Sequence, residues 1–450
     1  MNYKRYVLLF NIFFLLLLFG ASILFQWKPG IGGPNMRPLD IFSDVIKKPI
    51  GHDSITIGKI DSVTHSIAQH DYKTYAGLIN TSDHPTALFE FLSRIHELQQ
   101  KKRKKVRIAY FGDSMIEGDQ ITKDVRRLLQ QSFGGSGVGF VPVTSIIASF
   151  RTTITHSFSS GWNDESYKSS DKETADLFLS GHSFFSGANS IVTYKPVKQV
   201  GLDSFSNVSV LFGSPIDSGK TVANIVVNEN SFPIVAGAAI NILDTKTTNP
   251  KEVKISISST DIPLYGAAFE GDSGIVLDNF SFRGISGVEL NYFTPEYLKK
   301  VQETRPYDLM IFHFGPNLLS SPNVTNFNWY TNKMQPTLQK LRDALPQTSF
   351  LLISTADKAS SYDGSWRTEK GVQPLIDAQY IMAKSIGASF FNLYNAMGGE
   401  DAMVKWVTGD TVLARKDYTH PNNLGAQKFA EFIFNAIMNE YREYEKYNNK

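Results

Sequence analysis

The sequence predicts an α/β fold with a parallel sheet, an inserted all-β domain and an N-terminal transmembrane helix. Short apolar runs of strand length alternate with helical segments in residues 86–144 and again in residues 276–442. Between them, residues 145–275 carry β-rich runs separated by turn residues. Residues 1–27 contain a nearly unbroken apolar run. Alternation of strands and helices implies a parallel sheet with helices on both faces.

The composition narrows the class of protein. Of 450 residues, 42% are hydrophobic and 20% are charged, which is enough apolar surface for a sizeable core. Lysine and arginine number 45 against 43 aspartate and glutamate, so the chain has almost no net positive charge to attract a polyanion. We therefore expect no nucleic-acid partner. Cysteine is absent, which excludes disulfides, a thiol nucleophile and cysteine-ligated metals. We expect no metal and no cofactor.

Residues 1–27 are predicted to be a membrane anchor. Lys4 and Arg5 precede an apolar run of 22 residues, Tyr6 to Trp27, which would span about 33 Å as a helix. Because the basic residues lie on its N-terminal side, the rest of the chain should be exported. We expect a bacterial envelope protein, anchored in the inner membrane, with its folded part periplasmic or extracellular. A cleaved signal peptide, giving a secreted protein, is the alternative, but the apolar residues beyond Gly20-Ala21-Ser22 favour the anchor.

Residues 28–85 are expected to form a tether and a segment without a clear pattern. Three prolines and three glycines between Lys28 and Asp40 can hold neither a helix nor a central strand. A helix is expected from Thr86, and it should end in the basic run Lys101 to Lys105. We interpret that run as a solvated helix end; contact with anionic lipid or polysaccharide is the alternative.

A strand–turn–helix unit follows. A strand from Val106 to Phe111 leads at once into Gly112-Asp113-Ser114, and the next helix ends at Gly134-Gly135. Further strands are expected at residues 309–314, 350–355 and 389–393, and helices are expected to open at Pro374 and near Asn423. In sheets of this kind, ligand-binding and catalytic residues usually lie at the carboxyl ends of the strands.

The segment 145–275 is interpreted as an all-β insertion. Val253, Ile255 and Ile257 alternate with polar residues, as expected of a half-buried strand. A structural sandwich that shapes a cleft is the favoured interpretation, because aromatic side chains in a sandwich usually belong to its core. A carbohydrate-binding module is the alternative. Its stacking surface would come from Trp162, Tyr167, Phe184, Phe185 and Tyr265.

Polar residues follow two predicted strands and precede the last helix. Ser114 comes after the first strand, Asn317 after the strand at 309–314, and Asp417 and His420 before the last helix. A serine hydroxyl becomes a nucleophile when a histidine accepts its proton, and that histidine needs a carboxylate to fix its tautomer. Asp417 can supply the carboxylate to His420. The backbone N–H of Ser114, a glycine N–H and the Asn317 amide could stabilise an oxyanion.

Each signal also has an ordinary structural explanation. A second Gly-Asp-Ser stands at Gly271-Asp272-Ser273, but it precedes a strand instead of following one and is interpreted as a turn. Ser114 could cap a helix, Asn317 could be a turn residue, and His420 could cap the last helix. Their joint occurrence, in this order and in these loops, favours a catalytic site.

The motifs resemble those of the SGNH or GDSL hydrolases. Gly112-Asp113-Ser114 is similar to the first block of that superfamily, Gly315-Pro316-Asn317 to the third, and Asp417-Tyr418-Thr419-His420 to the fifth. The resemblance covers residues 106–144 and 276–440. It implies a flavodoxin-like three-layer SGNH hydrolase fold, a triad of Ser114, His420 and Asp417, and an oxyanion hole that includes Ser114 and Asn317.

The second block of the superfamily matches residues 283–287, where Gly287 is preferred as the oxyanion donor and Gly284 is the alternative. The third block is often followed by an aspartate. Leu318 stands at that position here, so any support that the aspartate gives elsewhere is missing.

Within the superfamily, the run from Phe133 to Phe140 followed by a β insertion resembles the peptidoglycan O-acetylesterases. This resemblance implies an exported serine esterase that removes O-acetyl groups from envelope polysaccharide, with acetylated peptidoglycan as the expected substrate. An O-acetyltransferase is the alternative, because an anchored, exported domain is also similar to periplasmic acetyltransferases that work beside a membrane acyl-transporting protein. A glycan-binding or assembly protein with a vestigial site is the second alternative.

Overall fold

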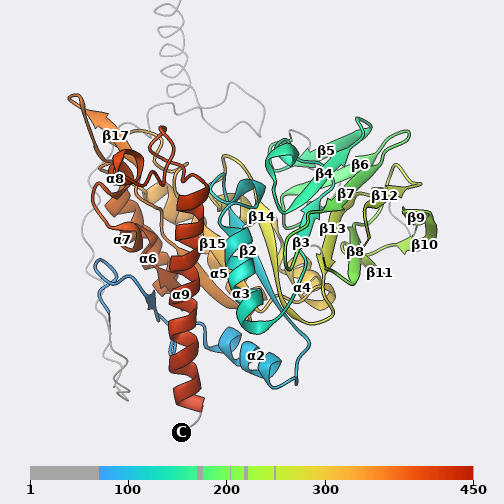
Figure 1. Cartoon of the computed structure of the whole chain (residues 1–450), viewed down its shortest axis with the longest axis horizontal. Coiled ribbons are helices and arrows are strands. Elements are labelled where there is room, and N and C mark those ends of the chain that lie inside the picture. The colour runs from blue at the N-terminus through green and yellow to red at the C-terminus, as the bar shows by residue number, and fades with distance from the viewer. Residues whose placement is uncertain (1–69, 170–175, 203, 217–220, 248–249, 449–450) are drawn as a thin grey trace, which may run out of the picture. The chain divides into compact units, whose positions relative to one another are not determined.

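Six strands form the central sheet, in the order β1-β19-β16-β15-β2-β14 (Figure 1). Five strands are parallel, and β1 pairs antiparallel with β19 at one edge. The sheet is therefore mixed, where the sequence predicted a parallel one. Its strands are β1 (Leu78–Ile79), β2 (Lys105–Gly112), β14 (Gly274–Ser281), β15 (Leu309–His313), β16 (Ser349–Ile353) and β19 (Ser389–Phe391).

The computed structural model describes residues 70–448, apart from residues 170–175, 203, 217–220 and 248–249. The predicted anchor at residues 1–27 lies outside this range, as do residues 28–69 of the predicted tether. In the part of the chain that is described, no helix is long and apolar enough to cross a membrane. Residues 78–79, which were expected to belong to the tether segment, form the edge strand β1.

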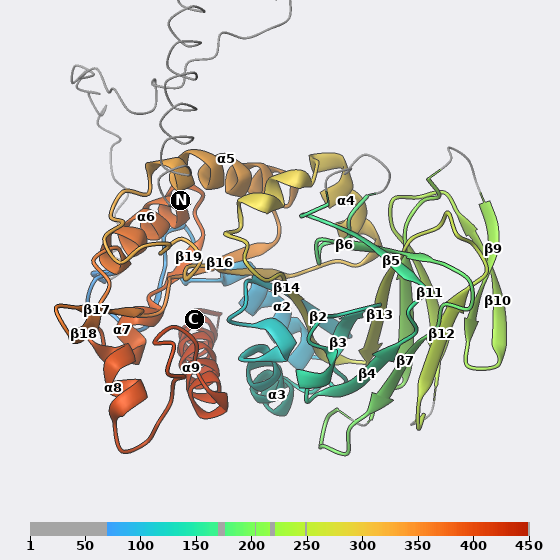
Figure 2. The ribbon, with the colours of Figure 1, turned by 90° about the horizontal axis from the view of Figure 1, so that it is seen from above.

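Both faces of the sheet are covered by helices, because the central strands are apolar on both sides. Along β2, Val106, Ile108 and Tyr110 pack on one side, while Ala109 and Phe111 pack on the other. Figure 2 shows one helix layer above the sheet and another below it. One layer contains α2 (Phe89–Gln99), α3 (Thr122–Phe133) and α9 (Asn423–Asn448), and the other contains α4 (Pro295–Thr304), α5 (Asn328–Ala344) and α6 (Val372–Ser385).

This arrangement confirms the three-layer α/β fold. The predicted helix before β2 buries Phe91, Leu92 and Ile95, as its spacing indicated. Gly134 ends α3 with a positive φ of 80°, which suits the glycine that the sequence places there. The remaining short elements are η1 (Glu117–Asp119), η2 (Ala148–Phe150), η3 (Val288–Tyr292), α7 (Leu393–Met397), α8 (Ala402–Thr408) and the hairpin β17 (Ala359–Tyr362) and β18 (Ser365–Thr368).

The segment between α3 and β14 in the sequence forms two antiparallel sheets, which enclose a separate hydrophobic core. One sheet has the order β10-β9-β12-β7-β4, and the other has the order β11-β8-β13-β6-β5, with β3 paired to β13. The strands span residues 139–270, compared with the predicted 145–275. They are β3 (Gly139–Pro142), β4 (Ile154–Phe158), β5 (Trp162–Ser166), β6 (His182–Ser186), β7 (Val192–Pro196), β8 (Asn207–Phe212), β9 (Thr221–Val227), β10 (Asn230–Ala236), β11 (Asn241–Lys246), β12 (Val253–Ile257) and β13 (Leu264–Glu270).

The aromatic residues of this β insertion are mostly interior. Tyr167, Phe184, Phe185 and Tyr265 are all less than 9% exposed, and only Trp162 is partly accessible. Four of the five side chains considered for stacking on sugars therefore serve the core, as the structural interpretation expected.

Buried ion pairs fasten the insertion to the central sheet. Glu270, at the end of β13, lies 2.6 Å from Arg305 and 2.7 Å from Lys105. Asp278 on β14 also pairs with Arg305 and accepts the backbone N–H of Phe140 at 2.8 Å. Burial favours the neutral acid at Glu270, but Arg305, Arg107 and Lys105 outweigh it and hold the pKa of Glu270 below its ordinary value.

Buried carboxyl groups elsewhere predict a stability that depends on pH. Burial raises the pKa of Glu440 to about 7 and that of Asp357 to about 6. Between about pH 4 and pH 7 the folded chain then binds protons that the unfolded chain releases, so stability should fall as the pH rises through this range. We expect the thermal midpoint to rise when the pH is lowered from about 7.5 to about 5.5.

Replacing Glu440 with glutamine should reduce this pH dependence. Glu440 accepts the N–H of Ala87 at 3.0 Å, and the glutamine oxygen can still do so. Glu431→Gln, on the same helix and paired with Lys428 at 3.2 Å, is the matched control. Equal slopes of midpoint against pH in all three proteins would contradict the assignment to Glu440.

Candidate active site

Ser114 lies in the tight turn between β2 and η1, at the carboxyl end of the sheet. The chain can turn here because Gly112 has no side chain: a Cβ at this position would lie 2.9 Å from Ile116 and 3.0 Å from the carbonyl of His313. Asp113 is fully buried, and its Oδ1 accepts the N–H of Met115 at 2.9 Å. The turn therefore holds the serine at a fixed place beyond the strand.

The structure brings Ser114, His420 and Asp417 together in one chain of hydrogen bonds. Ser114 Oγ lies 2.9 Å from His420 Nε2. His420 Nδ1 lies 2.9 Å from Asp417 Oδ2. The serine is 306 residues from the histidine in sequence, so this contact depends on the tertiary fold. The order hydroxyl, imidazole, carboxylate is the one that activates a serine nucleophile.

Asp417 is held by its own loop. Its Oδ1 accepts the backbone N–H groups of Thr419 and His420, each at 3.0 Å. Burial alone would raise the pKa of Asp417, but the hydrogen bonds from His420 and Thr419 outweigh it and lower this pKa. Asp417 is therefore ionised at neutral pH, as required of the group that orients the histidine.

The hairpin of β17 and β18 supports this loop. Trp366 stacks on Tyr418 with ring centroids 3.7 Å apart, and the N–H of Ala359 donates to the Tyr418 carbonyl at 3.1 Å. Tyr418 has a positive φ of 53°, which is uncommon for a side chain of its size. The contacts with Trp366 and Ala359 hold it in that conformation. The sequence carried no signal of this support.

Asn317 lies close to the serine turn. Its Nδ2 donates to Asp113 Oδ2 at 3.1 Å and to the carbonyl of Ile285 at 2.9 Å. Both amide hydrogens are thus used, and Asn317 joins the turn after β2 to the loop after β14. Burial is the main reason why the pKa of Asp113 is raised to about 6. The role of Asp113 as the acceptor for Asn317 was not predicted.

The two candidate glycine donors differ in their partners. The N–H of Gly287 donates to Glu289 Oε2 at 3.0 Å. Among the described residues, the N–H groups of Gly284 and Ser114 have no hydrogen-bond partner. Both glycines have positive φ angles, 79° for Gly284 and 95° for Gly287. Of these two glycines in the described loop, Gly284 is therefore the one whose backbone N–H is unused.

The serine turn is also joined to the β insertion. Asp119, in η1, pairs with Arg126 on α3 at 2.8 Å and accepts the hydroxyl of Thr153 from the insertion at 2.7 Å. Burial alone would raise the pKa of Asp119, but the positive charges of Arg126 and Arg151 outweigh burial and lower this pKa.

Within the described residues, no group of three or more His, Asp or Glu side chains could hold a metal ion.

Comparison with solved structures shows the fold. The chain is similar to a structure of a peptidoglycan O-acetylesterase with 20% identity and a TM-score of 0.67, over 81% of this chain and 99% of that one. A family two carbohydrate esterase from Cellvibrio japonicus also matches, at 10% identity and a TM-score of 0.27, over 64% of this chain and 99% of that one. No protein-family model matches the sequence, and no curated protein does. The comparison therefore confirms the predicted α/β fold with an inserted β domain, which this chain shares with the peptidoglycan O-acetylesterase structure.

Proposed function

We propose that this protein is a serine esterase that removes O-acetyl groups from an envelope polysaccharide, with acetylated peptidoglycan as its substrate. The observation that carries the proposal is the hydrogen-bonded chain of Ser114, His420 and Asp417 at the carboxyl end of the sheet. The choice of substrate is supported by the similarity of the fold to a structure named as a peptidoglycan O-acetylesterase.

The reaction follows from the positions of these groups. Ser114 Oγ attacks the acetyl carbonyl carbon while its proton moves to His420 Nε2. The sugar oxygen leaves with that proton, and the acetyl group stays on Ser114 as an ester. Water then attacks this ester, and His420 accepts one proton of the water and returns it to Ser114 Oγ as the ester bond breaks. The product leaves as acetic acid, which releases its own proton to the solvent to give acetate. No metal ion or cofactor is required for these steps.

We assign the oxyanion hole to the N–H groups of Ser114 and Gly284 and to the amide of Asn317. Gly284 replaces Gly287 as the preferred donor, because the N–H of Gly287 already serves Glu289. In the resting enzyme both amide hydrogens of Asn317 are used, one by Asp113 and one by the Ile285 carbonyl. One of these hydrogens must therefore also donate to the oxyanion when it forms.

Replacing Asn317 with alanine should lower kcat by about 10²- to 10³-fold with little change in KM, because the oxyanion forms only in the transition state. The measurement is steady-state hydrolysis of 4-nitrophenyl acetate. Asn326→Ala, an exposed asparagine of the same connection between β15 and α5, should keep the wild-type kcat. A wild-type kcat in Asn317→Ala would remove this residue from the site.

The proposed reaction is tested with the full-length chain purified in detergent. Acetylated peptidoglycan is supplied with and without an added oligosaccharide, and both free acetate and acetylated oligosaccharide are measured. Release of free acetate is the expected result. Acetate transfer to the oligosaccharide without release would indicate an acetyltransferase. If neither product forms and 4-nitrophenyl acetate is not hydrolysed, the protein is a binding or assembly protein.

We further propose that residues 1–27 hold this enzyme in the inner membrane with its folded part exported. The proposal rests on the apolar run after Lys4 and Arg5. The protein should remain with membranes after a high-salt wash, because about 22 apolar residues bind far more strongly than charge contacts do. A mature N-terminus between residues 20 and 35 would instead show a cleaved signal peptide.

A further inference from the structure

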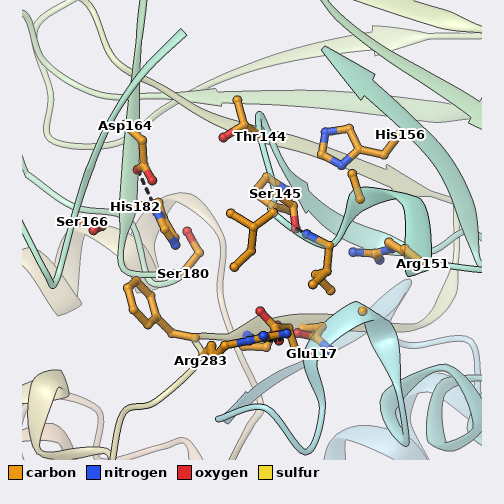
Figure 3. Close-up of a pocket in the computed structure, with 18 of the residues that line it drawn as sticks. Glu117, Thr144, Ser145, Arg151, His156, Asp164, Ser166, Ser180, His182 and Arg283 are labelled. Atoms are coloured by element: carbon orange, nitrogen blue, oxygen red, sulfur yellow. Dashed lines mark hydrogen bonds and ion pairs between the residues drawn. The ribbon is translucent and has the colours of Figure 1, made fainter. Parts of the chain in front are cut away.

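A cavity of about 280 Å³ lies where the β insertion meets the loops that carry the candidate site (Figure 3). The described residues belong to one compact unit, so both walls of the cavity are parts of the same folded unit. One wall includes Glu117, three residues after Ser114, and Arg283, which directly precedes Gly284. The other wall comes from β3 to β6 of the insertion. This pocket therefore shares its backbone with the serine turn and with the proposed oxyanion loop.

The insertion wall holds polar groups in fixed positions. His182 Nδ1 lies 2.8 Å from Asp164 Oδ1, and the His182 ring stacks on Phe282 with centroids 4.7 Å apart. These contacts leave His182 Nε2 without a hydrogen-bond partner among the described residues. Figure 3 shows His182 and Ser180 side by side on the pocket wall.

Ser180 is a second unused polar group. The residue is 5% exposed, and within the described part of the chain its buried hydroxyl has no hydrogen-bond partner. A buried hydroxyl without a partner costs about 1–3 kcal/mol, so its retention favours a ligand that satisfies it. Ser180 and His182 are two residues apart and line the same pocket.

The rest of the lining suits a small, hydroxyl-rich ring. Thr144, Ser145 and Asp164 add hydroxyl and carboxylate groups, and Ile146 adds an apolar surface that is 83% exposed. The volume of about 280 Å³ lies just below the usual range for small-molecule sites, about 300–1,000 Å³, and so suits a single small ring. A single sugar ring offers both the hydroxyl groups and the apolar faces that this lining would contact.

We infer that this pocket binds one sugar residue of the glycan, adjacent to the residue that carries the acetyl ester. The inference rests on the proposed esterase activity, because it places the pocket beside the scissile bond. His182 Nε2 and Ser180 Oγ contact the sugar hydroxyls. The β insertion thus takes part in substrate selection through polar groups of the pocket, while its aromatic residues form the core.

The test compares the preference for the polymer over a small ester. We expect His182→Ala to lower the ratio of kcat/KM for acetylated peptidoglycan to kcat/KM for 4-nitrophenyl acetate by about 10-fold. His182→Gln keeps more of the side-chain volume and should lower the same ratio. Lys254→Ala, on the exposed side of β12, is the control and should keep the wild-type ratio.

Wild-type ratios in both His182 variants would overturn the pocket assignment. If the wild-type protein hydrolyses neither substrate, the esterase proposal fails, and the pocket is then tested by binding alone. For this purpose, full-length Ser114→Ala protein in detergent is sedimented with acetylated peptidoglycan. Weaker co-sedimentation when His182→Ala is added would support the pocket, and equal co-sedimentation would overturn it.

A separate observation concerns Lys168, which extends from the insertion to the oxyanion loop. Its Nζ donates to the carbonyl oxygen of Arg283 at 2.9 Å, and a Cβ on Gly284 would lie 3.3 Å from it. The Arg283 carbonyl and the Gly284 N–H belong to one planar trans peptide and point in opposite directions. We propose that Lys168 is a positioning residue that orients the Gly284 N–H toward the oxyanion. This proposal also rests on the esterase activity.

Lys168→Met removes the ammonium and keeps the apolar stem. Because the orienting contact is lost, we expect kcat for 4-nitrophenyl acetate to fall about 5- to 10-fold with a smaller change in KM, and Lys168→Arg to restore most of it. Lys195→Met, at an exposed position of β7, is the matched control. A wild-type kcat in Lys168→Met, or no recovery in Lys168→Arg, would contradict the positioning role. Esterase activity in the wild type separates this outcome from failure of the proposed function.

Discussion

Replacing Ser114 with alanine is expected to lower ester hydrolysis by about 10⁴-fold or more without unfolding the protein. In the proposed mechanism the hydroxyl forms the acyl-enzyme, and neither His420 nor Asp417 replaces it as the nucleophile. Stability should change little, because the turn is held by Gly112 and by the Asp113 side chain, whose Oδ1 accepts the Met115 N–H, and the substitution leaves both in place. Hydrolysis of 4-nitrophenyl acetate and the thermal midpoint are measured on the same preparation.

The second Gly-Asp-Ser supplies an internal control. Ser273 is exposed in the turn between β13 and β14, where Asp272 pairs with Lys246 at 2.7 Å. Ser273→Ala should therefore retain the wild-type rate. If Ser273→Ala lost activity and Ser114→Ala kept it, the assignment of the nucleophile would be wrong.

The sequence predicted those parts of the fold that are encoded locally. The strand from residue 106, the turn at Gly112 and the helix ending at Gly134 lie where their spacing placed them. The strand is apolar at every position from 106 to 111 except Arg107, which indicates burial on both faces, and the structure shows that Val106 and Phe111 contact opposite helix layers. The edge strand at Leu78–Ile79 was missed because two residues carry no periodicity.

The candidate site likewise contains contacts that the sequence could predict and contacts that it could not. Asp417 and His420 are three residues apart, so their contact could be inferred from spacing, and the resemblance to the SGNH hydrolases linked them to Ser114. The choice between Gly284 and Gly287 could not be made from sequence, because it depends on where the Glu289 carboxylate lies. The contact of Lys168 with Arg283 joins residues 115 apart and has no local signature.

Replacing His420 with alanine should be about as damaging as replacing Ser114, with a loss of about 10⁴-fold in kcat for 4-nitrophenyl acetate. His420 Nε2 lies 2.9 Å from Ser114 Oγ. In the proposed mechanism it accepts the serine proton, so without it the hydroxyl is a weak nucleophile at neutral pH. The double variant Ser114→Ala with His420→Ala should be no slower than either single variant, because the two residues act in one step.

Asp417→Ala should lower kcat for 4-nitrophenyl acetate less than His420→Ala does, so that its kcat is about 10-fold to 100-fold higher than that of His420→Ala. The carboxylate acts through the histidine and does not touch the substrate, and its side chain is 47% exposed, so water can solvate part of the charge on the imidazolium. The order of the three rates is therefore the measurement that identifies a triad. If His420→Ala retained more activity than Asp417→Ala, His420 would not be the general base. The 2.9 Å contact with Ser114 would then only orient the hydroxyl, and another group would have to accept its proton.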